Sequence, residues 1–101
     1  MTPHGEPIVV QVDPDLKDLI PGFLRNRHDD VVTLRAALER SDWETLRRLG
    51  HRLRGSGGGY GFDPITDMGE SLEAAAKRQD PAAIRKATDD LATYLERIVV
   101  V

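Results

Sequence analysis

The residue in this sequence with the clearest capacity for chemistry is His51, because three arginines stand three or four positions away from it. Arg47, Arg48 and Arg54 lie three or four residues away, a spacing that places side chains on one face of a helix. Imidazole changes its protonation state near neutral pH, and nearby cations disfavour its charged form. We therefore expect a neutral ring nitrogen that can attack phosphorus, beside guanidinium groups that attract the negative charge so acquired.

Helical geometry predicts that His51 faces solvent. With about 100° between successive residues and Leu53 pointing into the core, His51 lies about 160° from the core direction. Leu46 and Leu49 lie within about 40° of Leu53 and continue the buried side. Two interpretations without chemistry stay open: a histidine packed in the core, which this geometry disfavours, and an ordinary surface histidine.

Small residues share the helix face with His51. Gly55 follows it by one turn and Gly58 by two, and Ser56 lies between them. Because these side chains have little bulk, a second protein could approach the imidazole closely. We therefore predict that Gly55, Gly58, Ser56 and the nearby Arg48 dock a partner.

The run of three consecutive glycines before Tyr60 needs an explanation, because a glycine inside a helix is about 1 kcal/mol less favourable than alanine. We predict that the helix continues to about Gly59, since Gly57 and Tyr60 keep the spacing of its buried side. Gly61 then ends the helix in a left-handed cap. The alternative is a helix that ends at Ser56 and leads into a flexible loop.

Helix starts recur along the chain. Three Asp-Pro pairs and a segment of capping-box type mark them, because aspartate caps a helix and proline suits its first position. Helices should therefore begin near residues 14, 42, 64 and 81. The corresponding segments are Asp13-Pro14, Ser41-Asp42-Trp43-Glu44, Asp63-Pro64 and Asp80-Pro81.

Between these starts, apolar residues recur at three- and four-residue steps, as in helices that bury one face. Four such stripes joined by short turns predict an all-α fold, an antiparallel four-helix bundle. Pro21 separates a short additional N-terminal helix from the first long one, because proline disrupts a helix interior. The stripes are Leu24, Val31, Leu34 and Leu38; Leu46, Leu49, Leu53 and Tyr60; Ile65, Met68 and Leu72; and Ile84, Leu91, Leu95 and Ile98.

A length of 101 residues suits one domain. We divide the chain into an extended N-terminal lead-in over residues 1–12 and a helical bundle over residues 13–101. Ile8 to Val12 should stay unpaired, because no partner strand is evident. Without cysteine the chain cannot form disulfides, and its start shows neither a signal peptide nor a membrane span. We therefore expect a cytoplasmic monomer.

The segment Gly50-His51-Arg52-Leu53-Arg54-Gly55-Ser56, followed by Gly61-Phe62, resembles the signature of histidine-containing phosphotransfer (HPt) domains of bacterial phosphorelays. The resemblance extends from about Asp13 to Val99 and includes the Leu72-Glu73 stretch. Two features depart from the commonest pattern: Arg54 replaces a lysine, and the glycine run replaces alanine and serine. The positions that match in type and spacing are His51, Leu53, Arg54, Gly55, Ser56 and Gly61.

The resemblance implies that His51 accepts a phosphoryl group from a receiver-domain aspartate and passes it to another receiver, with Arg54 and Arg47 favouring the charged intermediate. It implies no ATP site and no cofactor bound by this domain, and it places Mg2+ on the partner receiver domain. The implied partners are response-regulator receiver domains and a hybrid sensor histidine kinase.

Other kinds of function have less support. A catalytically inert helical adaptor could dock receivers or kinases without phosphotransfer, and only the intact His51 speaks against it. The arginines between residues 47 and 54 could contact nucleic acid, but a net charge of -3 argues against that. No frame of the glycine-rich segment completes a dinucleotide-binding motif or a P-loop, and the histidines lack the spacing of metal ligands.

Overall fold

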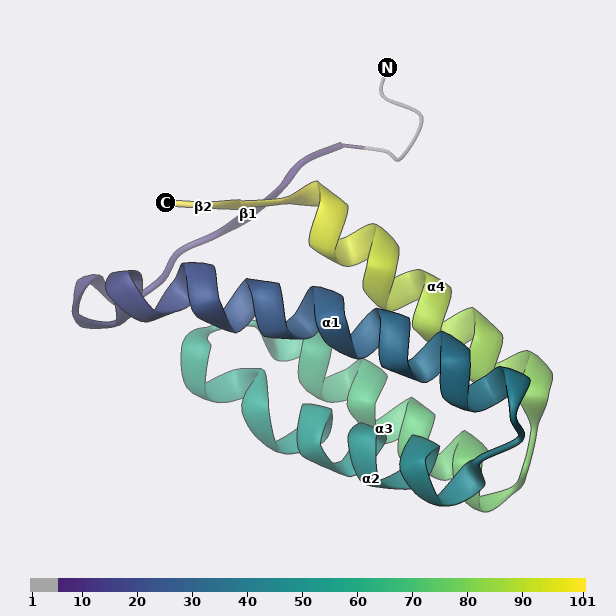
Figure 1. Ribbon diagram of the computed structural model, residues 1–101. Coiled ribbons are helices and arrows are strands. Elements are labelled where there is room, and N and C mark those ends of the chain that lie inside the picture. Colours follow the sequence, from purple (N-terminus) through teal and green to yellow (C-terminus); the bar gives the residue numbers. More distant parts are fainter. Residues whose placement is uncertain (1–5) are drawn as a thin grey trace.

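The computed structural model describes residues 6–101, and four long helices make up most of it. In Figure 1 these helices lie in antiparallel order, so the predicted all-α four-helix bundle is confirmed. No helix between residues 6 and 101 combines the length and apolar character that a membrane crossing requires. The elements in chain order are β1 (Ile8–Val10), the 3₁₀ helix η1 (Pro14–Leu19), α1 (Ile20–Glu39), α2 (Trp43–Ser56), the 3₁₀ helix η2 (Gly58–Tyr60), α3 (Asp63–Lys77), α4 (Pro81–Arg97) and β2 (Ile98–Val100).

The helix starts follow the predicted capping signals. The side chains of Asp13, Asp42 and Asp80 each accept a hydrogen bond, of 2.9 to 3.2 Å, from a backbone N–H two or three residues further on. Asp63 differs, because α3 begins at Asp63 itself and Phe62 occupies the cap position. Local capping by aspartate therefore sets most of the helix starts, as predicted.

The predicted short N-terminal helix is present and has 3₁₀ geometry. It ends at Leu19, and α1 begins at Ile20 with Pro21 in its first turn. A proline in the first turn lacks an N–H that would have no partner there, so it starts the long helix without disrupting it.

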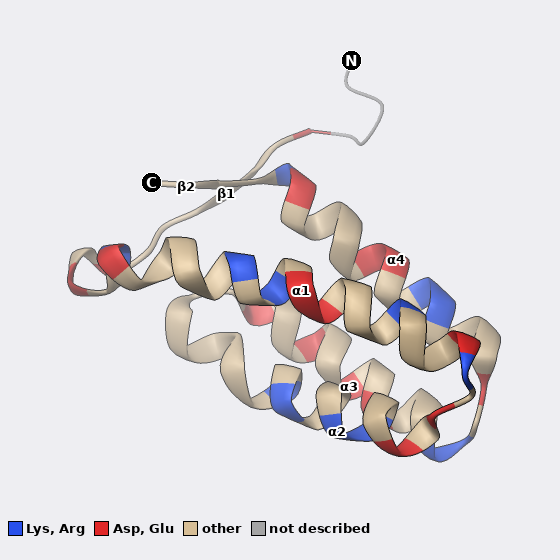
Figure 2. Ribbon diagram, in the orientation of Figure 1, with Lys and Arg blue, Asp and Glu red and all other residues tan. Residues whose placement is uncertain are grey.

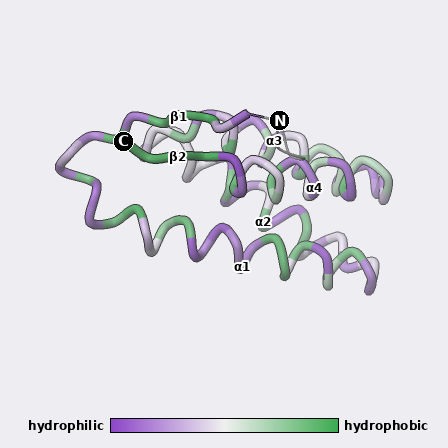
Figure 3. Tube along the Cα trace, turned by 90° about the horizontal axis from the view of Figure 1, so that it is seen from above, coloured by the Kyte–Doolittle hydropathy of each residue, from purple (hydrophilic) through white to green (hydrophobic). Residues whose placement is uncertain are grey.

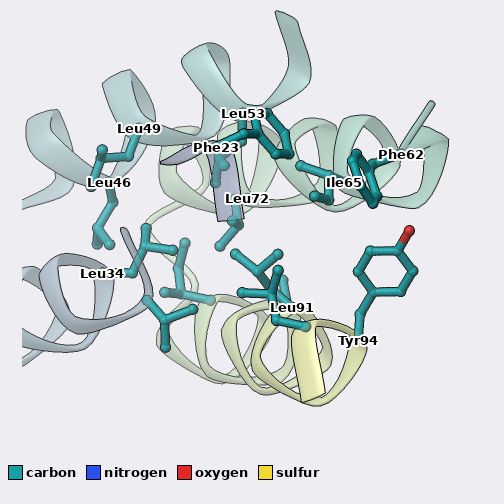
Figure 4. Close-up of a cluster of buried hydrophobic side chains, with 14 of the residues drawn as sticks. Phe23, Leu34, Leu46, Leu49, Leu53, Phe62, Ile65, Leu72, Leu91 and Tyr94 are labelled. Atoms are coloured by element: carbon teal, nitrogen blue, oxygen red, sulfur yellow. The ribbon is translucent and has the colours of Figure 1, made fainter. Parts of the chain in front are cut away.

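Each long helix contributes side chains to one core. Leu34 from α1, Leu46 and Leu53 from α2, Leu72 from α3 and Leu91 from α4 are fully buried. Figure 4 shows that these labelled side chains converge between the helices. The stripes predicted from the sequence therefore contain the buried faces of the bundle.

The segment Ile8–Val10 is a strand with a partner, so the prediction of an unpaired lead-in is wrong there. β1 pairs in parallel with β2, and Val9 lies opposite Val99. Figures 1 and 3 show the two strands side by side, and Figure 3 colours both as hydrophobic. Ile98, which we had placed on the fourth helical stripe, belongs to β2. Residues 1–5 of the predicted lead-in lie outside the described part of the chain.

The helix α2 ends sooner than we predicted. Its last residue is Ser56, and the chain then tightens into η2, so continuation of the α-helix to Gly59 is wrong. The turn is hydrogen-bonded: the Phe62 N–H donates to the Gly57 carbonyl (2.9 Å), and the Gly61 N–H donates to a carbonyl of η2 (3.2 Å). Gly61 has a φ of 90°, so the predicted left-handed cap is confirmed. This bond pattern is that of a Schellman motif.

Candidate functional site

His51 lies midway along α2 and exposes 62% of its side chain. Leu49 and Leu53, two positions to either side, are buried in the core. The predicted solvent-facing orientation is therefore confirmed, and the alternative of a core histidine is wrong. A second protein can reach this ring without any rearrangement of the bundle.

One nitrogen of the His51 ring is held by a residue of the neighbouring helix. Its Nδ1 lies 3.1 Å from Oε2 of Glu73 on α3, and Glu73 exposes only 9% of its side chain. An ionised carboxylate can only accept hydrogen bonds, so Nδ1 must carry the proton in this contact. In the neutral ring, Nε2 then holds the lone pair and can act as the nucleophile.

Glu73 also binds an arginine from α2. Its Oε1 lies 3.2 Å from Nη1 of Arg54, so the carboxylate joins Arg54 to His51. Burial raises the pKa of the Glu73 carboxyl, but the hydrogen bond from His51 and the charge of Arg54 outweigh burial and hold this pKa below its ordinary value of 4.5. Glu73 is therefore ionised near neutral pH and accepts the Nδ1 proton.

The other arginines of α2 have different neighbours. Nη2 of Arg47 lies 2.9 Å from Oε1 of Glu44, one turn earlier on the same helix. Arg48 is exposed. Arg52, which directly follows His51, reaches towards α1, where its Nη2 lies 3.4 Å from Oδ1 of Asp30. Arg47 and Arg54 both belong to carboxylate pairs, so either would have to change partner in order to bind a phosphoryl group.

The small residues that we predicted to dock a partner lie at the surface. Gly55 and Gly58 are exposed, and a Cβ atom built on Gly55 would meet nothing within 4 Å. Ser56 is half-buried, and its hydroxyl donates to the Leu53 carbonyl (3.2 Å) within α2. Space is thus open at Gly55, one turn after His51, while Gly58 lies in η2 beyond the end of α2 and Ser56 uses its hydroxyl within its own helix.

Glu73 is the residue whose part in this site the sequence analysis missed. The Leu72-Glu73 stretch was noted only as part of a family resemblance. A signal was present, because Glu73 stands directly after the buried Leu72 and before the buried Ala75 and Ala76. A charged residue among core positions of a helix needs a partner when it is buried. Figure 2 shows basic positions recurring along α2 and acidic positions along α3.

The fold and the site together define a class: a helical bundle that presents an exposed imidazole oriented by a buried carboxylate. Comparison with protein families agrees with this, since the model of the Hpt domain family matches residues 18–99. The chain belongs to the Hpt domain family. Searches of the curated proteins and of the solved structures each gave no significant match.

Membership of this family carries a general function. Hpt domains are histidine phosphotransfer modules of phosphorelays in two-component signalling, and they interact with receiver domains and kinases. They carry phosphoryl groups and are not catalysts with an ATP site of their own. This chain therefore has a phosphotransfer role.

Proposed function

We propose that His51 accepts a phosphoryl group from the aspartate of one receiver domain and passes it to the aspartate of another. The observation that carries the proposal is the exposed imidazole, whose Nδ1 lies 3.1 Å from a carboxylate oxygen of Glu73. Nε2 attacks phosphorus, the N–P bond forms, and the P–O bond to the aspartate breaks so that the carboxylate leaves. Transfer to the second receiver reverses these bond changes.

Glu73 stabilises the phosphorylated ring in this scheme. When Nε2 acquires phosphorus while Nδ1 keeps its proton, the ring becomes positively charged. The ionised carboxylate of Glu73 lies next to that proton and offsets the charge, which lowers the energy of both the intermediate and the transition state leading to it. Glu73 thus holds a proton in place and does not itself react.

Arg54 and Arg47 bind the phosphoryl oxygens after changing partners. Arg47 leaves an exposed ion pair with Glu44, which contributes only about 0 to 1 kcal/mol, and Arg54 leaves Glu73, whose carboxylate keeps its contact with His51. The exchange therefore costs little, and guanidinium groups form strong hydrogen bonds to phosphate oxygens. These arginines orient the phosphoryl group and steer an acidic partner.

The partner supplies the remaining parts. Gly55 and Gly58 are exposed and carry no side chain that would obstruct its approach, and in this scheme Ser56 and the exposed Arg48 also contact the partner. Mg2+ is bound by the carboxylates of the receiver rather than by this domain. A hybrid sensor histidine kinase and its receiver stand upstream of this relay step, and a response regulator stands downstream.

Label transfer tests the proposal. The protein is mixed with a receiver domain carrying labelled phosphate in the presence of Mg2+, and the wild type should acquire label that is lost in acid and retained in base. His51→Gln should acquire none while keeping its helicity. His28→Gln, at an exposed histidine of α1, is the matched control and should be labelled like the wild type.

The same experiment distinguishes the adaptor function. An inert adaptor would bind the receiver, as measured by calorimetry, without acquiring label on any histidine. Labelling that persists in His51→Gln would place the acceptor elsewhere and contradict the proposal.

A further inference from the structure

The backbones of α2 and α3 meet at two glycines. A Cβ atom built on Gly50 would lie 2.6 Å from the backbone nitrogen of Glu73 and 3.0 Å from the carbonyl oxygen of Gly69. A Cβ atom built on Gly69 would clash with the Arg54 nitrogen and lie 2.8 Å from the Gly50 carbonyl oxygen. Both glycines are buried. The helices therefore approach each other more closely than any side chain at these positions permits.

The residues at this crossing are those of the phosphoacceptor site. Gly50 directly precedes His51, and Gly69 stands one turn before Glu73 on α3. The closest atom that an added Cβ would meet is the backbone nitrogen of Glu73 for Gly50 and the backbone nitrogen of Arg54 for Gly69. The side chains of these two residues form the contacts around the imidazole. The separation of the two helices at this point thus sets the distance that the Glu73 side chain has to span.

We propose that the contact of Gly50 with Gly69 is a positioning device, which holds α3 close enough for Glu73 to bind Nδ1 of His51 and so leaves Nε2 as the nucleophile. This inference rests on the proposed function of His51 and assigns the two glycines an indirect part in it.

The distances show why the contact is sensitive to helix separation. To accept an alanine at position 50, the Glu73 backbone would have to retreat from 2.6 Å to the 3.4 Å of ordinary contact. A displacement of that size between the helices lengthens the 3.1 Å contact between Nδ1 and Oε2 beyond the reach of a hydrogen bond, about 3.5 Å. The imidazole then loses its orientation, and either ring nitrogen can carry the proton.

A third glycine provides a matched control. A Cβ atom built on Gly57 would lie 2.6 Å from the Phe62 carbonyl oxygen and 2.9 Å from Cβ of Ile65, so it clashes at the same interface. None of the closest atoms belongs to Glu73 or Arg54. Gly22 is the control for added volume alone, since its Cβ would meet nothing within 4 Å.

The experiment compares Gly69→Ala and Gly50→Ala with Gly57→Ala and Gly22→Ala. The first readout is the nitrogen chemical shifts of the His51 ring in the unphosphorylated protein, at about pH 8 where a free imidazole is neutral. We expect Nδ1 to be the protonated nitrogen in the wild type and in the two controls, and a mixture of both forms in Gly69→Ala and Gly50→Ala.

The second readout is the rate of phosphotransfer from a labelled receiver. Loss of a residue that orients a reactive group typically reduces activity by about 10- to 100-fold. We therefore expect Gly69→Ala to slow transfer about tenfold and Gly57→Ala less than about twofold at equal folded fraction. Adding Glu73→Gln to Gly69→Ala should slow it by less than about a further twofold, because both changes remove the same contact. If the rate reductions caused by Gly69→Ala and by Glu73→Gln instead multiply in the double variant, the proposal is contradicted.

Glu73→Asp keeps the test decisive if the alanine variants do not fold. It retains the charge and the helix crossing but shortens the side chain by one methylene, and so separates the carboxylate from the ring without a clash. The proposal requires Glu73→Asp to show the mixed ring protonation and about tenfold slower transfer. If Glu73→Asp keeps the wild-type ring signature and rate, the glycine contact has no positioning role. Failure of the wild type to accept label, with its ring signature intact, would instead contradict the proposed function.

Discussion

Two carboxylates of this bundle lie in nearly the same setting but bind different partners. Glu73 on α3 and Asp30 on α1 each expose only 9% of their side chain. Each contacts two basic side chains, and one of the two is a residue of α2 with 62% of its side chain exposed. At Glu73 that exposed partner is the His51 imidazole, and at Asp30 it is the Arg52 guanidinium. Burial of the carboxylate therefore does not distinguish the two regions, whereas the chemistry of the partner does.

The Asp30 region can stabilise the fold but offers no nucleophile. Nε of Arg27 lies 2.9 Å from Oδ2 of Asp30, and the contact with Arg52 joins α1 to α2. Arg27 is almost fully buried, and its guanidinium lies 4.8 Å from the centroid of the Phe23 ring. A guanidinium keeps its proton in proteins and has no lone pair to offer. The same kind of ion pair thus serves packing in one region and reactivity in the other.

The largest effect should come from breaking the Asp30 region. Asp30→Ala leaves Arg27 buried without its partner, so we expect the free energy of unfolding to fall by about 3 kcal/mol. Urea unfolding followed by circular dichroism measures this. Asp89→Ala, which removes an exposed partner of Arg35, is the control and should cost less than about 1 kcal/mol. Equal losses in the two variants would remove the contrast between a buried and a surface pair.

The next effect concerns the rate of transfer and separates the two regions directly. Glu73→Gln keeps the shape of the side chain but removes the charge that offsets the phosphorylated ring, so transfer from a labelled receiver should slow about tenfold. Asp30→Asn should change the rate per folded molecule by less than about twofold, because Asp30 does not touch the imidazole. A similar loss of rate per folded molecule in both variants would mean that direct contact with the imidazole is not what makes Glu73 important for transfer.

Acid should weaken the fold through Glu73. Its pKa is lowered in the folded protein, so the stability that the charged carboxylate contributes is complete above the ordinary value of 4.5 and is lost as the pH falls through the lower folded value. Glu73→Gln has no such group. The stability difference between the wild type and Glu73→Gln, measured by urea unfolding, should therefore shift against the wild type as the pH falls below 4.5. A difference independent of pH would contradict the ion contacts of Glu73.

The smallest effect distinguishes the arginines on either side of His51. Arg54→Ala removes a guanidinium that can move from Glu73 to a phosphoryl group, and we expect about threefold slower transfer, since exposed ion pairs contribute about 0 to 1 kcal/mol. Arg52→Ala should leave the rate unchanged, because Arg52 reaches towards Asp30 instead. The dependence of the transfer rate on salt concentration should weaken more in Arg54→Ala than in Arg52→Ala. A larger loss in Arg52→Ala would reverse the assignment of these two side chains.

The Glu73 contact shows where prediction from the sequence stopped. The exposure of His51 followed from the spacing of Leu46, Leu49 and Leu53, which belong to the same helix. Nothing in that spacing states which residue of α3 lies beside the ring. Gly69 was not identified, and Gly50 was named only as the first residue of the segment that resembles the family signature, because a glycine at a close crossing differs from any other helical glycine only in what packs against it.

The end of α2 teaches a similar lesson. The spacing of Gly57 and Tyr60 fits a continuing helix, but Phe62 is fully buried, and its N–H bonds to the Gly57 carbonyl (2.9 Å). Burial of this aromatic side chain against Phe23, with ring centroids 5.3 Å apart, favours a tight turn over another turn of α-helix. The left-handed cap at Gly61 was predictable, because it depends on the conformational freedom of that glycine alone.

Capping signals and helical periodicity were enough to predict the helices, their starting residues, and the face of α2 on which His51 lies, because both act between residues at most a few positions apart. The contact of Glu73 with Nδ1 of His51, the contact of Asp30 with Arg52, and the pairing of β1 with β2 could be seen only once the helices were packed together. These contacts join segments that are distant in the chain. They depend on how closely whole elements pack, which no local pattern specifies.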